Sequence, residues 1–371
     1  MKDRGEQYNP TRPNRFAYEY SIQHIGNIER SCKPMRLDIR RFSLQLKHEF
    51  TIARGTRTLV PVVFLELHHD GIVGIGEASP SSRYGETVES VEAFLSKVNL
   101  EPFESPFIID AILGYIRNIA PGNFAAKAAI DIALHDWIGK KLGIPLYKFL
   151  GLEGKQTPYS SYTIGIDTPE KVMQKVKEAA EYPILKIKLG LENDREIMNA
   201  IRSVTRKTLR VDVNEGWKTR ELALESIEWL SELGVEFVEQ PMPASQIDDI
   251  AWLRERSPLP LIADESVMRL EDIPVLAHAF DGINIKLMKC TGIREALKMI
   301  SAARASRLKV MMGCMIESSV GISAAAQLSP LIDFADLDSA EMISNDPYEG
   351  AVIEKGRLKL PDRPGIGVKE G

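Results

Sequence analysis

The stretch Ile184-Leu185-Lys186-Ile187-Lys188-Leu189-Gly190 places two lysines two positions apart within an apolar run. In a β-strand the side chains alternate between two faces, so Lys186 and Lys188 share one face and the apolar residues between them share the other. A strand buried on both faces is normally apolar throughout, because a buried ammonium group must be matched by anions, a metal site or a substrate carboxylate. The stretch is therefore either an edge strand with a hydrated face or a central strand whose lysines face a functional site.

Short apolar runs alternate with amphipathic helical patterns from about residue 156 to 345. The runs predict eight strands, at Pro158–Thr163, Ile184–Lys188, Leu209–Val213, Val235–Glu239, Leu261–Glu265, Ile283–Lys286, Val310–Gly313 and Phe334–Leu337. Helices are predicted between them, among others at 169–181, 194–205, 219–233 and 292–305. Strand–helix alternation with eight strands is typical of a parallel (β/α)₈-type barrel, in which all strand ends meet at one rim.

The chain before the barrel has a different rhythm. Residues 1–34 are polar with little periodicity and are interpreted as an N-terminal extension. Residues 35–155 contain three alternating runs followed by three helical patterns, which predicts a separate α+β domain. The strands are expected at 35–48, 59–68 and 71–77, and the helices near 87–98, 106–117 and 123–141. The tail, 346–371, is expected to return to this first domain.

The link between the first two strands, residues 50–57, contains Arg54 and Arg57 and is too long for a tight hairpin. It is interpreted either as a mobile lid over a site or as a solvated loop.

Composition excludes several classes of protein. The 371 residues carry a formal net charge of −5, which gives no electrostatic case for binding nucleic acid or an anionic membrane. No apolar run approaches the ~20 residues of a membrane span, and the polar N-terminus has no apolar core of a secretory signal. The three cysteines, Cys32, Cys290 and Cys314, are widely spaced, which predicts reduced thiols in a cytoplasm.

Three acids end successive strand candidates: Asp212, Glu239 and Asp264. Their spacings of 27 and 25 residues are about one βα unit each, so the carboxylates converge on the barrel rim. A single acid at a strand end is often part of a structural ion pair. Three in register would raise each other's pKa and require a cation, and oxygen ligands with room for water and substrate suit Mg²⁺.

Two lysines flank these acids. Lys188 precedes them around the ring and Lys286 follows them, so the two approach a metal-bound substrate from opposite sides. One base on each face of a carbon is the arrangement of a racemase or epimerase, with the metal stabilising the enediolate that forms when the α-proton leaves. A lysine base needs its pKa lowered from about 10.4 toward 7–8, and the cation, Lys186 and burial favour that direction.

These motifs together resemble the muconate-lactonising subgroup of the enolase superfamily, from about residue 35 to the end of the chain. The matching motifs are KIK at Lys186–Lys188, DVN at Asp212, EQP at Glu239, ADES at Asp264 and NIK at Lys286. The resemblance implies an α/β fold, a modified (β/α)₇β TIM-type barrel with an N-terminal α+β capping domain, and one Mg²⁺ per subunit. Lys186 is expected to contact the substrate carboxylate, and Asn214 and Glu265 are expected to support the metal ligands.

A further motif, Asp336-Leu-Asp338, ends the eighth strand candidate with two acids on one face. It resembles the Asp-x-Asp of dipeptide epimerases, including L-Ala-D/L-Glu epimerases, where the pair binds the substrate's α-ammonium group; a buried ammonium needs facing anions. Taken alone, the motif would indicate a helix N-cap with a surface acid. Thr163 and Glu317 are further candidates for substrate binding, although Glu317 could instead cap the next helix.

The leading hypothesis is a cytoplasmic, homo-oligomeric, Mg²⁺-dependent epimerase of a small-molecule dipeptide, with no nucleic acid or membrane partner. It would transfer a proton at the α-carbon of the C-terminal residue. Arg54 and Arg57 would pair an acidic side chain, which favours L-Ala-D/L-Glu and peptidoglycan-peptide metabolism.

Alternatives on the same scaffold are an o-succinylbenzoate synthase or muconate cycloisomerase-type lyase, and an N-acylamino acid racemase. A non-catalytic ligand-binding barrel is a third. Asp336 and Asp338 favour the epimerase over the lyases, whose anionic substrates carry no ammonium group.

Overall fold

The computed structural model describes residues 34–52 and 55–371. Arg54 and residues 1–33 of the expected N-terminal extension lie outside these described residues. Within the described part of the chain, no helix is both long and apolar enough to cross a membrane.

The first unit is an antiparallel sheet with helices, as predicted. Its strands, in the order β1-β2-β3, are β1 (Arg36–Ile52), β2 (Gly55–His69) and β3 (Ile72–Ala78). The helical segments that follow are η1 (Ser82–Tyr84), α1 (Val88–Leu95), α2 (Ile109–Ile119), α3 (Phe124–Leu142) and α4 (Leu146–Phe149). Gly74 and Gly76 let β3 lie directly on α3, because a Cβ atom at either position would come within about 2 Å of an α3 carbonyl oxygen.

The 50–57 link differs from its prediction. Phe50 pairs with Arg57 and Thr51 with Thr56, so β1 and β2 form one long hairpin that continues through the supposed loop. The link looked too long because an irregularity in β1, between Gln45 and Phe50, takes up the extra residues. The carbonyl oxygen of Thr51 accepts a hydrogen bond from Ile166 N at 2.9 Å, which anchors the hairpin to the chain after β4.

The second unit contains the eight predicted parallel strands, in the order β11-β10-β9-β8-β7-β6-β5-β4. They are β4 (Tyr162–Ile164), β5 (Ile184–Lys188), β6 (Thr208–Asp212), β7 (Val235–Glu239), β8 (Leu261–Ala263), β9 (Gly282–Ile285), β10 (Lys309–Gly313) and β11 (Phe334–Asp336). A parallel bridge between Ser160 and Ala335 joins the two ends of the sheet, which makes it a barrel.

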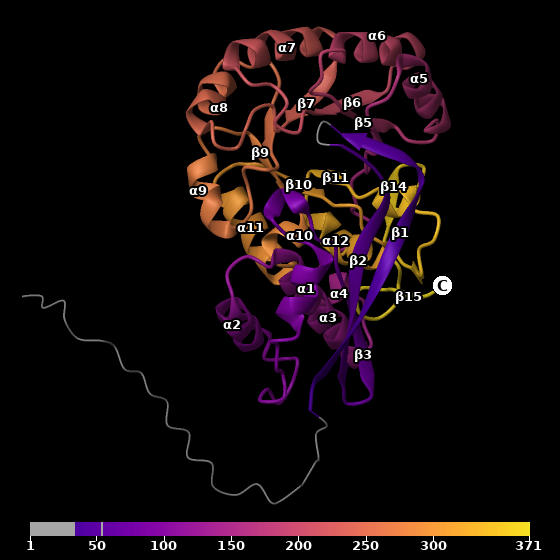
Figure 1. The fold of residues 1–371 in the computed structure, drawn as a ribbon, viewed down its shortest axis with the longest axis vertical. Helices are drawn as coiled ribbons and strands as arrows, with labels where there is room; N and C mark the ends of the chain where they lie inside the picture. The colour runs from indigo at the N-terminus through magenta and orange to yellow at the C-terminus, as the bar shows by residue number, and fades with distance from the viewer. Residues whose placement is uncertain (1–33, 53–54) are drawn as a thin grey trace, which may run out of the picture. The chain divides into compact units, whose positions relative to one another are not determined.

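Helices follow the strands and surround the sheet on its outside (Figure 1). They are α5 (Pro169–Glu178), α6 (Asp194–Val204), α7 (Arg220–Glu232), α8 (Ile247–Arg254), η2 (Leu270–Asp272), α9 (Ile273–Leu276), α10 (Leu287–Cys290), α11 (Ile293–Ala305), α12 (Ser319–Ala326), η3 (Ser329–Leu331) and η4 (Ser339–Met342).

The C-terminal segment forms two short ribbons, β12 (Tyr348–Glu349) with β15 (Lys369–Glu370) and β13 (Val352–Glu354) with β14 (Arg357–Lys359). Gly365 exchanges hydrogen bonds with the turn before α4, and Ile366 N donates to Asp136 of α3 at 2.9 Å. The tail therefore contacts the N-terminal unit.

Strand β5 resolves the question posed by its two lysines. It pairs with β4 on one side and β6 on the other, so it is a central strand. Leu185 and Ile187 are buried in the apolar layer, and Lys186 is only 1% exposed. The hydrated-edge interpretation is therefore wrong, and the buried ammonium group must have partners inside the barrel.

Candidate active site

The three predicted metal ligands meet at the carboxyl ends of neighbouring strands. Asp212 is the last residue of β6, Glu239 is the last of β7, and Asp264 directly follows β8. All three are buried, and each offers a carboxylate oxygen within 4.8 Å of the other two. The spacing of the three acids predicted that they would converge, and the structure places them together.

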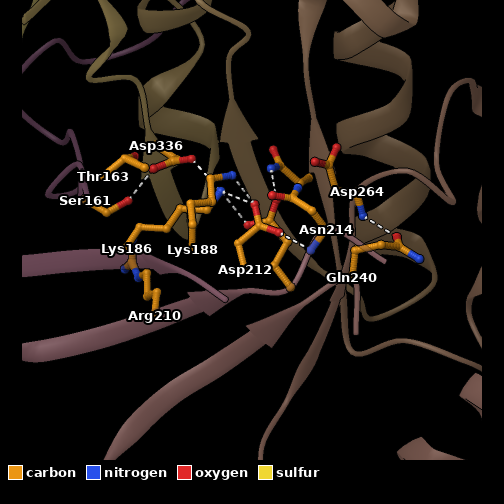
Figure 2. A network of polar contacts seen from close by, with 12 residues as sticks. Ser161, Thr163, Lys186, Lys188, Arg210, Asp212, Asn214, Gln240, Asp264 and Asp336 are labelled. Atoms are coloured by element: carbon orange, nitrogen blue, oxygen red, sulfur yellow. Dashed lines mark hydrogen bonds and ion pairs between the residues drawn. The ribbon is translucent and has the colours of Figure 1, made fainter. Parts of the chain in front are cut away.

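Three lysines contact the carboxylates of this triad. Lys188 Nζ lies 2.6 Å from Asp212 Oδ2, and Lys286 Nζ lies 2.8 Å from Asp264 Oδ2, so they contact its two ends. Lys186 Nζ lies between them, 2.7 Å from Glu239 Oε2 and 3.1 Å from Asp212 Oδ2. In Figure 2 the side chains of Lys186 and Lys188 run side by side from β5 toward Asp212.

Electrostatics within the triad are uneven. Burial, and next the charge of Asp212, raise the pKa of Glu239. Burial also acts against ionised Asp212, but Lys188 and Lys186 outweigh it and lower the pKa of Asp212. For Lys286, burial alone would lower the pKa, yet Asp264 outweighs burial and raises it. With the carboxylates as its partners, Lys286 is thus shifted away from the direction that a lysine base needs.

Two further residues contact the triad that sequence reasoning missed. Lys289 Nζ, on α10, lies 2.5 Å from Asp264 Oδ1 and is buried, and Asn284 Nδ2 donates to Glu239 Oε1 at 2.8 Å. The signal for Asn284 was available, because it stands two residues before Lys286 and so shares its strand face. Lys289 belongs to a short helix whose direction the sequence does not reveal.

The expected supporting residues lie beside the ligands. Asn214 donates its backbone N–H to Asp212 Oδ1 at 3.0 Å and its side-chain amide to Glu265 Oε1 at 3.2 Å. Gln240 Oε1 accepts from Asp264 N at 2.9 Å (Figure 2). Asn214 and Gln240 have φ of +48° and +35°, a left-handed conformation that is uncommon outside glycine and concentrates at functional sites.

Asp336 is a further partner of Lys186, and Asp338 contacts the neighbouring strand β4. Asp336 Oδ2 is 2.7 Å from Lys186 Nζ, and its other oxygen accepts from Ser161 Oγ at 2.6 Å. Asp338 accepts from the backbone N–H of Thr163 at 2.6 Å and from its hydroxyl at 3.3 Å. Both acids are buried, so the motif is part of the barrel interior and not a surface cap.

A cavity of about 350 Å³ joins these groups, within the size range of small-molecule sites. Barrel residues contribute one wall and the N-terminal unit contributes the other. The lining includes Lys186, Lys188, Lys286, Asn214, Thr163, Asp336 and Asp338 from the barrel side, and Phe50, Arg57, Val60, Ser79 and Arg83 from the N-terminal unit.

Glu317 is placed differently from the other candidates. It is buried outside the cavity lining, and its carboxylate accepts from Met315 N at 2.7 Å. Arg54 lies outside the described residues, whereas its neighbour Arg57 lines the cavity.

Family comparisons agree with this geometry. Residues 37–151 match the mandelate racemase / muconate lactonizing enzyme N-terminal domain, and residues 170–369 match the enolase C-terminal domain-like family. The chain is 53% identical over 335 residues to an L-Ala-D/L-Glu epimerase of Bacteroides thetaiotaomicron, covering 90% of this chain and 88% of that protein.

Solved structures give the same result. The L-Ala-D/L-Glu epimerase from Bacillus subtilis, in a substrate-liganded complex, superposes with a TM-score of 0.86 at 31% identity, over 91% of this chain and 99% of that one. A dipeptide epimerase from Enterococcus faecalis V583, complexed with Mg and L-Leu-L-Tyr, gives a TM-score of 0.84 at 34% identity, over 91% and 99%. The chain therefore belongs to the mandelate racemase / muconate lactonizing enzyme family of the enolase superfamily.

Proposed function

We propose that the protein is a Mg²⁺-dependent dipeptide epimerase that inverts the α-carbon of the C-terminal residue, with L-Ala-D/L-Glu as its dipeptide. One observation carries the proposal: Lys188 and Lys286 contact opposite ends of a buried carboxylate triad, and both lysines line one cavity. Groups so placed can reach the two faces of one carbon atom. The activity is that of the Bacteroides relative at 53% identity.

The residues present fit a divalent cation. Asp212, Glu239 and Asp264 supply three hard oxygen donors within 4.8 Å, a ligand set suited to Mg²⁺. The raised pKa of Glu239 shows that a third negative charge is costly in this buried triad, and a bound cation would offset that cost. When bound, Mg²⁺ would supply Lewis-acid stabilisation of the negative charge that develops on the substrate carboxylate.

The chain's own groups move the proton. In one direction Lys188 Nζ removes the α-proton and Lys286 Nζ returns one to the opposite face, and in the other direction the roles exchange. Each lysine must be neutral when it accepts. A cation on the triad would weaken the carboxylate charges that now raise the pKa of Lys286. Lys186, which contacts two triad acids, remains the cation beside the substrate carboxylate.

Asp336 and Asp338 distinguish this function from the alternatives. A lyase of the o-succinylbenzoate synthase or muconate cycloisomerase type, or an N-acylamino acid racemase, has no substrate ammonium to place. A buried acidic pair lining the cavity is unfavourable for such substrates and favourable for a dipeptide's amino terminus.

An acidic C-terminal side chain has a matching cation in Arg57, which is exposed at the hairpin and lines the cavity. Arg57→Ala should therefore raise KM for Ala-Glu about tenfold while leaving Ala-Val nearly unchanged, as expected for a charge-assisted contact. Equal effects on both dipeptides would argue against Glu as the preferred residue.

We also propose how the enzyme is organised and where it acts. Residues 35–155 would form the capping domain, 156–345 the catalytic barrel and 346–371 a segment returning to the cap, in keeping with the family matches at 37–151 and 170–369. We further propose a homo-oligomer that acts in the cytoplasm on peptidoglycan-derived peptides.

The decisive experiment is a dipeptide library screened for α-proton exchange in deuterated water with Mg²⁺. Exchange at the C-terminal α-carbon, followed by appearance of the epimer, supports the proposal. Turnover of N-acyl amino acids in preference to dipeptides would favour the racemase, and a change in bond connectivity without exchange would favour a lyase.

A further inference from the structure

One wall of the cavity is built by the loop between β10 and α12, residues 314–318. Cys314, Met315 and Ile316 from this loop line the cavity directly. The loop belongs to the barrel, yet it is held from the N-terminal unit. Its position therefore depends on residues far away in the sequence.

Glu77, on β3, makes the principal contacts. It is fully buried, and one carboxylate oxygen accepts from Ser318 N at 2.9 Å. The other accepts from Ser318 Oγ at 2.6 Å and from Gly321 N at 2.9 Å. Nearby, Ser79 Oγ donates to the carbonyl oxygen of Ile316 at 2.8 Å. Strand β3 thus holds both the loop and the start of α12.

The chemistry of these contacts explains why an acid stands there. A carboxylate is favourable at a helix N-terminus, where backbone N–H groups lack partners within the helix. Ser318 is the N-cap of α12, and its hydroxyl also accepts from Val320 N at 3.1 Å. Glu77 adds a second cap from outside the barrel, so the helix start is fixed relative to β3.

We propose that Glu77 is a positioning residue of the active site, which sets the 314–318 wall and thereby the affinity for the dipeptide. Its kinetic consequence rests on the proposed epimerase function. The contact itself does not, because it can be measured without substrate.

The test compares Glu77→Gln with Thr87→Ala. Gln keeps the size of the side chain but replaces one carboxylate oxygen by an NH₂ group. Each oxygen of Glu77 accepts from a backbone N–H, of Ser318 or of Gly321, so one of these N–H groups would then face another donor. Thr87 caps α1 in the same unit, accepting from Ser90 N at 3.2 Å, and lies outside the cavity lining. Both variants lose a cap, but only Glu77→Gln should disturb the wall.

Two readouts are needed. Glu77→Gln should raise KM about five- to tenfold with kcat within about twofold, the size expected for one lost hydrogen bond, whereas Thr87→Ala should leave both unchanged. Amide hydrogen exchange over residues 314–321 should accelerate in Glu77→Gln and stay at the wild-type rate in Thr87→Ala.

The outcomes separate the two proposals. Unchanged exchange over 314–321 in a folded Glu77→Gln protein would overturn the positioning role, as would a KM equal to that of Thr87→Ala. If the wild-type protein epimerises no dipeptide but the exchange difference is present, the proposed function fails and the positioning of the loop stands. If Glu77→Gln does not fold, Ser79→Ala removes the other hydrogen bond to the loop, from Ser79 Oγ to the carbonyl oxygen of Ile316, and should accelerate exchange over 314–318 to a smaller extent.

Discussion

Lys186 Nζ lies 2.7 Å from Asp336 Oδ2, although the two residues are 150 positions apart in the chain. They were expected at opposite ends of a dipeptide, and the contact shows that the two ends of the site share a charge pair. Burial would raise the pKa of Asp336, but Lys186 outweighs it and lowers it. Burial, and next Asp336, raise the pKa of Asp338. Asp336 already has a cationic partner in Lys186, whereas ionised Asp338 is disfavoured. We therefore infer that a substrate ammonium group stabilises the charge of Asp338 more than that of Asp336.

Blocking the substrate's amino group should be costly. N-acetylation of the dipeptide should lower kcat/KM, and the corresponding loss of transition-state stabilisation should be at least about 2 kcal/mol, because a buried anion is left without its cation. Asp338→Asn should lower kcat/KM for the free dipeptide and so reduce the difference in kcat/KM between the free and the acetylated dipeptide. Asp336→Asn is the comparison variant, because it also removes a partner of Lys186; it should slow both substrates and change their ratio less than Asp338→Asn does. An enzyme that accepts the acetylated dipeptide equally well would support N-acylamino acid racemisation.

The two lysines should have separable roles. Lys188→Ala and Lys286→Ala should each reduce epimerisation by about 10³-fold or more, the scale of general acid–base catalysis. Each variant should still exchange the α-proton of one epimer, and of opposite epimers, in deuterated water followed by NMR. Lys171→Ala, on the exposed side of α5, is the control and should be active. Epimerisation in both directions at the parental rate by either site variant would contradict the two-base mechanism.

Metal dependence can be checked by activity and by stability. Chelator should abolish epimerisation and Mg²⁺ should restore it. Mg²⁺ should also raise the midpoint of thermal unfolding, because a ligand that binds only the folded state stabilises it. Glu239→Gln should remove this shift, whereas Glu228→Gln, on the exposed face of α7, should retain it. Full activity in excess chelator would be incompatible with the proposed site.

Stability should fall as the pH rises through neutrality. Burial, and next Glu77, raise the pKa of Glu317 to about 8, and burial raises the pKa of Glu77 to about 7. Both values exceed the ordinary 4.5, so the folded state holds more protons and loses stability between about pH 4.5 and 8. In urea unfolding, the loss of stability of Glu317→Gln between pH 4.5 and 8 should be smaller than that of the wild type by up to about 5 kcal/mol, at about 1.4 kcal/mol per pKa unit. Parallel pH curves for the two proteins would refute this account.

Much of this protein is determined by local sequence. Period-2 alternation placed Lys186 and Lys188 on one strand face, and the structure confirms it. One βα unit between Asp212, Glu239 and Asp264 was enough to predict their convergence, because parallel strands in a barrel end on a common rim. These features depend on backbone geometry that repeats along the chain.

Tertiary structure alone decided the rest. Strands β1 and β2 pair again at Phe50–Arg57 and Thr51–Thr56 because an irregularity just before Phe50 absorbs residues, which no local pattern shows. Asp336 forms an ion pair with Lys186, and Lys289 forms one with Asp264. Glu77 caps a helix that begins 241 residues later in the chain. Such pairings depend on side-chain directions and on how separate elements pack. A sequence states which charges are present, but only the fold determines which of them become partners when water is excluded.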